Sequence, residues 1–178
     1  SRILALCAYD WIFEALTPDQ RREIIVPLLE HVAEIQPGPG KPAIIRRNTG
    51  GPKTGFYSVP SLLWYAGLAA HGDGFCDDLA RSQLEKGYAL NREMLDFRAA
   101  SSGDDGALVS GVSGYSMGAY PWAHFNFFHT YLSATGENIA MRYPELALFP
   151  NWIWWTWIPN ARDPQRPLQF GWGDDQHD

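Results

Sequence analysis

The sequence predicts an all-α protein in which helices buried on most sides alternate with helices buried on one side. Two observations predict this fold class: apolar residues recur at helical spacing in several segments, and stretches rich in Gly and Pro separate those segments. A strong helix-start motif at residues 17–20 is a third. With 178 residues, the chain has room for one ordinary domain with a sizeable core.

The first 36 residues are expected to form a helical hairpin. Between residues 3 and 13, apolar side chains occur nearly all round the helix, which predicts burial on most sides. Residues 17–20 (Thr-Pro-Asp-Gln) then supply an N-cap, a first-turn proline, an acidic residue and a capping-box glutamine. Pro27 is expected to bend the second helix or to start it afresh. The apolar face of that helix consists of Ile24, Ile25, Leu28, Leu29, Val32 and Ile35.

The same alternation recurs further along the chain. Residues 57–71 are apolar on most sides, residues 75–98 carry one charged face, and residues 120–134 again have the pattern of a buried helix. Inner helices of an α/α barrel contact neighbours on all sides and outer helices on one, so this order predicts an α/α toroid. Two full helix pairs and part of a third do not close a ring. Residues 1–160 are therefore expected to form an incomplete toroid.

The most hydrophobic stretch is the aromatic run NWIWWTWIP at residues 151–159. It is too short to cross a bilayer, which needs about 20 residues, so we expect a buried helix or strand. Aromatic residues make up 14% of the chain. That content is enough to fill a core, and also to line a groove in which sugar rings stack on aromatic side chains.

Charge and cysteine content exclude some classes of function. The formal net charge of −6 argues against nucleic-acid binding, because phosphate neutralisation needs an excess of Lys and Arg. An anionic ligand would therefore have to meet a local basic patch. The two cysteines, Cys7 and Cys76, have neither metal-site spacing nor a disulfide framework. Each is expected to be a small buried apolar residue.

Three segments occur in an order that resembles a known family. They are residues 5–13 (ALCAYDWIF) followed by residues 16–21 (LTPDQR), residues 66–73 (AGLAAHGD), and residues 104–106 (DDG) leading to Ser113-Gly114-Tyr115. Together they resemble the heparinase II/III-like polysaccharide lyases over about residues 3–135. The resemblance implies a secreted or periplasmic α/α-toroid enzyme without a cofactor, which cleaves acidic polysaccharides by β-elimination. It also implies that residues 161–178 lead towards a β-sandwich domain in the remainder of a parent chain.

The resemblance implies roles for two residues. β-Elimination removes the proton next to a uronic acid carboxylate, so it needs a positioned base and a donor that stabilises the developing enolate. Tyr115 matches the position of the family's catalytic tyrosine, and it suits the role of base if neighbouring charge lowers its pKa from about 10. Asn48 is the best match to the neutralising residue. The alternatives are that Tyr115 packs its ring and that Asn48 forms a turn in Asn-Thr-Gly-Gly.

Five further residues are candidates for substrate binding. Arg47 and Lys53 could form the basic patch that an acidic substrate requires. The alternative is that Arg47 and the adjacent Arg46 simply face solvent, as neighbouring arginines usually do. Tyr120 and Trp122 could stack on sugar rings, and His124 could line the same cleft or pack in the core. The acidic tail at residues 174–178 matches no closed metal site, so no metal is assigned.

Two other functions stay open at this stage. A glycoside hydrolase on a similar scaffold would use two carboxylates, such as Asp104 or Asp105 with Asp10 or Glu14. A non-catalytic sugar-binding or structural fragment would use its aromatic residues only for stacking. Neither alternative involves nucleic acid or a membrane, and both share the expected polysaccharide partner.

Overall fold

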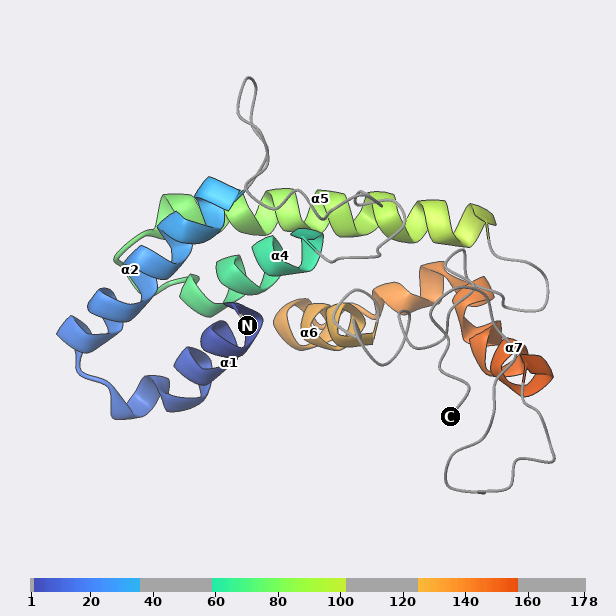
Figure 1. The fold of residues 1–178 in the computed structure, drawn as a ribbon, viewed down its shortest axis with the longest axis horizontal. Coiled ribbons are helices and arrows are strands. Elements are labelled where there is room, and N and C mark those ends of the chain that lie inside the picture. Colours follow the sequence, from blue (N-terminus) through green and yellow to red (C-terminus); the bar gives the residue numbers. More distant parts are fainter. Residues whose placement is uncertain (1, 36–58, 102–124, 157–178) are drawn as a thin grey trace. The chain divides into compact units, whose positions relative to one another are not determined.

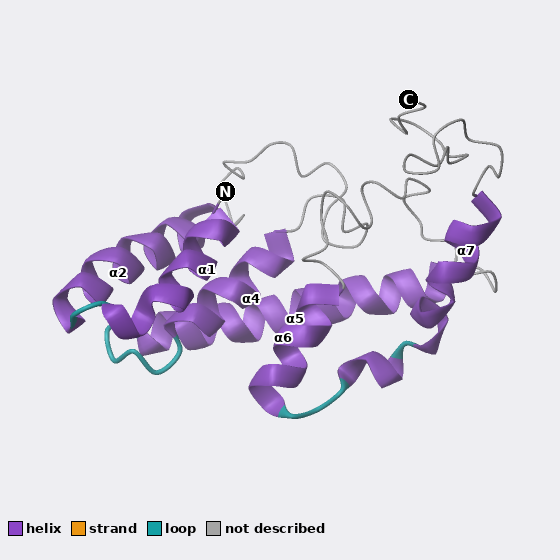
Figure 2. Ribbon diagram, turned by 90° about the horizontal axis from the view of Figure 1, so that it is seen from below, coloured by secondary structure: helices purple, strands orange, loops and turns teal. Residues whose placement is uncertain are grey.

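The computed structural model describes residues 2–35, 59–101 and 125–156 of the chain. These residues form helices joined by turns, with no strand among them, so the predicted all-α class is confirmed (Figure 2). The chain divides into two compact units. The first contains residues 1–52 and 57–92, and the second contains residues 53–56 and 93–178.

The first unit is a helical bundle (Figure 1). Its elements are α1 (Arg2–Ile12), the short 3-10 helix η1 (Phe13–Ala15), α2 (Pro18–Ile35), α4 (Val59–Ala70) and most of α5 (Asp77–Ser101). The helix α4 contacts both α1 and α2, and it lies between α1 and α5 in Figure 1. The bundle therefore has α4 at its centre.

The predicted start of the second helix is confirmed in detail. The backbone N–H of Thr17 donates to Gln20 Oε1 at 2.9 Å, and the backbone N–H of Gln20 donates to Thr17 Oγ1 at 3.3 Å. These reciprocal bonds form the capping box that the sequence predicts. Pro27 lies inside α2, which continues through it as one helix, so of the two expected outcomes, a bend or a fresh start, the fresh start is wrong. The buried face of α2 is Ile25, Leu29 and Val32.

The helix α4 is buried on most sides, as predicted. Five consecutive residues, Leu62, Leu63, Trp64, Tyr65 and Ala66, are all buried. Two glycines let α4 and α5 approach closely. A Cβ placed on Gly67 would lie 2.8 Å from the backbone oxygen of Ala80, and one on Gly87 would lie 2.8 Å from Trp64 Cα.

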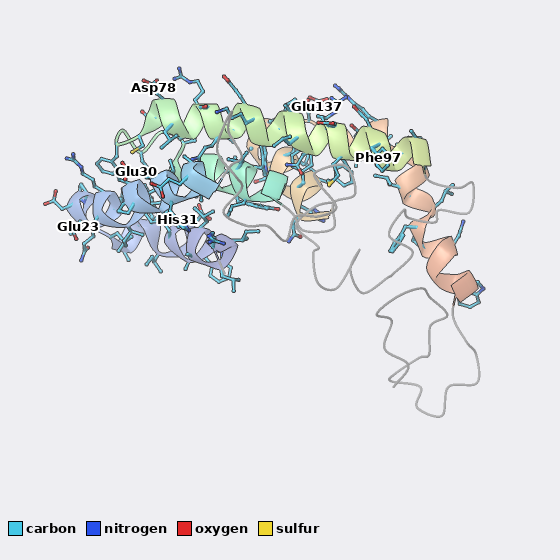
Figure 3. All side chains as sticks on the ribbon, turned by 45° about the horizontal axis from the view of Figure 1, so that its top comes forward. Glu23, Glu30, His31, Asp78, Phe97 and Glu137 are labelled. Atoms are coloured by element: carbon cyan, nitrogen blue, oxygen red, sulfur yellow. The ribbon has the colours of Figure 1, made fainter. Side chains whose placement is uncertain are left out.

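The helix α5 is buried on one side, again as predicted. Its buried positions in the first unit are Ala80, Gln83, Gly87 and Asn91, spaced three or four residues apart on one face. Charged residues such as Asp78 lie on the exposed side (Figure 3). The central and half-exposed helices thus alternate from α2 to α5 as the sequence analysis expects.

The helix α1 departs from the prediction. Only one of its faces is buried, through Ile3, Leu6 and Tyr9, whereas Trp11 is 84% exposed and Leu4 is 57% exposed. The expectation of burial on most sides was wrong. Apolar residues all round a helix indicate that every face can pack against another element. The faces that are buried are those that have a neighbouring element.

The second unit contains the end of α5, α6 (Phe125–Thr135), the 3-10 helices η4 (Ile139–Arg142) and η5 (Pro144–Leu148), and α7 (Phe149–Thr156). The Tyr143 hydroxyl donates to Asp96 Oδ1 of α5 at 2.8 Å. Gly136 has a positive φ of 76° and its N–H donates to Leu132 at 2.8 Å, which ends α6.

Two predictions for this unit are only partly correct. Residues 151–156 of the aromatic run lie in the helix α7 rather than in a strand, but Trp154 is 79% exposed, so the expected burial is wrong at that residue. In α6, Phe127 is buried, while His129 and Leu132 are exposed. The helix α6 is therefore not buried on most sides along its described length.

Candidate functional site

The residues predicted to act on a substrate lie outside the described part of the chain. They are Tyr115, Asn48, Lys53, Arg47, Tyr120, His124 and Trp122. Asp104, Asp105 and the acidic tail lie outside it as well. Of the carboxylates proposed for hydrolysis, Asp10 and Glu14 are described, and both are exposed on α1 and η1.

Within the described residues, a polar group centred on Tyr9 joins several elements of the first unit. We call Tyr9, Phe13, Arg21 and Asp73 the Tyr9 cluster. Tyr9 is 1% exposed, and its hydroxyl donates a hydrogen bond to Asp73 Oδ2. The Tyr9 and Phe13 rings meet edge to face with centroids 5.8 Å apart. The cluster thus ties α1 to the turn between α4 and α5.

Arg21 joins the cluster from α2. Its Nε donates to the backbone oxygen of Phe13 at 3.0 Å, and its Cζ lies 3.7 Å from the centroid of the Phe13 ring. A guanidinium over an aromatic face is attracted by the negative face of the ring. Arg21 therefore makes two contacts with Phe13, the first residue of η1. It donates a hydrogen bond to the Phe13 carbonyl, and it covers the Phe13 ring that packs on Tyr9.

The turn that carries Asp73 depends on two glycines. Gly72 has φ 85° and Gly74 has φ 80°, a conformation that L side chains rarely adopt. The N–H of Asp73 donates to Ala70 at 3.3 Å, and the N–H of Gly74 donates to Asp77 Oδ1 at 3.0 Å. The sequence Gly-Asp-Gly therefore reverses the chain sharply and places the Asp73 carboxylate where Tyr9 can reach it.

The electrostatics of the cluster keep Tyr9 protonated. Burial raises the pKa of the Tyr9 phenol well above its ordinary value, and the hydrogen bond to Asp73 and the negative charge of that carboxylate raise it further. The positive charge of Arg21 acts in the opposite direction. A phenol with a raised pKa donates hydrogen bonds and is a poor general base. The Tyr9 cluster is thus suited to holding elements together rather than to abstracting protons.

Cys7 and Cys76 are free thiols that are half-buried, whereas the sequence predicts that each is a small buried residue. Burial raises the pKa of both, with Asp10 contributing at Cys7 and Glu30 at Cys76. Because the thiolate is the reactive form, these environments disfavour nucleophilic chemistry at either residue.

Two buried amides on α5 have an oxygen without a hydrogen-bond partner among the described residues. Gln83 donates from Nε2 to the Leu29 oxygen at 2.9 Å, which leaves its Oε1 unpaired. Asn91 donates from Nδ2 to the Gly87 oxygen at 2.8 Å, which leaves its Oδ1 unpaired. The residues are eight positions apart, about 12 Å along the helix, so they do not form one site.

No family model matches the chain, and no match is found among curated proteins or solved structures. In the described ranges, no helix has the combination of length and apolar content required to span a membrane. The same ranges contain no group of three or more His, Cys, Asp or Glu side chains placed to hold a metal ion.

Sequence reasoning missed the Tyr9 cluster. Tyr9 and Asp73 are 64 positions apart, so no local pattern joins them. Two signals were present: a tyrosine on the face shared with Ile3 and Leu6, and an aspartate between two glycines. A buried tyrosine usually finds a partner for its hydroxyl, so an acidic residue in a tight turn was a reasonable candidate.

Proposed function

We propose that this chain is the helical part of a polysaccharide lyase that cleaves uronic-acid-containing polysaccharides by β-elimination. The observation that carries the proposal concerns two of the segments that resemble heparinase II/III-like lyases. Residues 5–13 and residues 66–73 are far apart in the sequence, yet α1 packs on α4, and Tyr9 of one segment bonds Asp73 of the other. Segments that act as one structural unit are expected to be retained together.

The proposal includes an arrangement of the helices as part of an α/α toroid. The helix α4, buried on most sides, has the character of an inner helix, and α2 and α5, buried on one face, have the character of outer helices. An inner helix flanked by two outer ones is the repeating motif of such a ring. We propose that the enzyme acts in a secreted or periplasmic location, because its polymeric substrate is extracellular.

In the proposed reaction, Tyr115 is the base and Asn48 neutralises the substrate carboxylate. Arg47 and Lys53 attract the acidic chain, and Tyr120, Trp122 and His124 contribute to the walls of the cleft. Tyr9 does not compete for the role of base, because its raised pKa keeps the phenol protonated. The catalytic tyrosine requires the opposite environment, with positive charge or hydrogen-bond donors that favour the phenolate.

The test follows the unsaturated product of β-elimination by its ultraviolet absorbance. The full-length protein carrying this chain is assayed on a panel of uronic-acid polymers, beside its Tyr115→Phe variant. We expect absorbance to rise with the unmodified protein and the rate to fall at least about 100-fold in the variant, because general base catalysis contributes about 10²–10⁴-fold. Tyr131→Phe on α6, which removes a hydroxyl that donates to Glu137, is the matched control and should retain activity.

Two results would replace the proposal with an alternative. New reducing ends without the absorbance would indicate glycoside hydrolysis, and binding without any turnover would indicate a sugar-binding fragment. Full activity in Tyr115→Phe would exclude this tyrosine as the base.

A further inference from the structure

We draw no further inference here: the strongest candidate, the exposed apolar face of α1 that includes Leu4, Trp11 and Ile12, carries no proposal because nothing in the described part of the chain shows what covers it.

Discussion

Replacement of Tyr9 by phenylalanine removes a hydroxyl that links α1 to the Asp73 turn. The ring stays in place on Phe13, so packing is retained, and only the hydrogen bond to a partly buried carboxylate is lost. Hydrogen bonds to charged groups contribute about 1.5–3 kcal/mol. We therefore expect Tyr9→Phe to lower the free energy of unfolding of the first unit by about that amount, measured by urea denaturation.

Two comparisons separate this bond from general effects of the substitution. Tyr131→Phe removes the same group from a bond of 3.2 Å to Glu137, but at an exposed site, so the loss should be less than about 1 kcal/mol. Asp73→Ala, which removes the acceptor, in both backgrounds completes a double-mutant cycle, and a coupling energy near zero would refute the assignment.

The raised pKa of Tyr9 gives the same bond a dependence on pH. Because the phenol is held protonated in the folded state, its contribution is fully present below its unfolded pKa of about 10. It is lost as the pH rises from there through the higher folded value, since the unfolded chain then releases the proton more readily. The stability deficit of Tyr9→Phe should consequently be constant near neutral pH and shrink above about pH 10. A deficit that grows with pH in that range would contradict this reasoning.

Two further predictions concern the α4–α5 contact and its buried amides. Gly87→Ala should destabilise the first unit by about 1–3 kcal/mol, because the added Cβ meets Trp64 Cα at 2.8 Å, and that clash outweighs the gain in helix propensity. Ala89→Gly, the reverse substitution at an exposed site of α5, serves as the control. Measured by urea denaturation, it gives the difference in helix propensity between Ala and Gly without a clash. Asn91→Leu should be neutral or stabilising in thermal unfolding, since it removes a buried oxygen without a partner. A large loss of stability would contradict this expectation.

Local features of the fold could be predicted from the sequence, and features that depend on distant residues could not. The capping box joins Thr17 and Gln20, which are three positions apart in the chain. The four-residue motif was therefore enough to predict both hydrogen bonds. The burial of α5 on one side could also be predicted locally, because charged residues recur on one face of that segment of the sequence. The Tyr9–Asp73 bond joins residues from two helical pairs, and neither residue shows its partner in its own segment. The candidate catalytic residues rest on a resemblance, because Tyr115 and Asn48 belong to segments without a helical period that would predict their neighbours.

The contrast between α1 and α4 shows which part of burial a sequence pattern can predict. Both helices are apolar nearly all round, yet Trp64 of α4 is 4% exposed and Trp11 of α1 is 84% exposed. The helix α4 has α1 and α2 as neighbours, and Gly87 lets α5 approach it on another side. The described residues supply α1 with partners for one face only. The periodicity of apolar residues thus predicts which faces of a helix can be buried. Which of those faces are buried depends on the neighbouring helices.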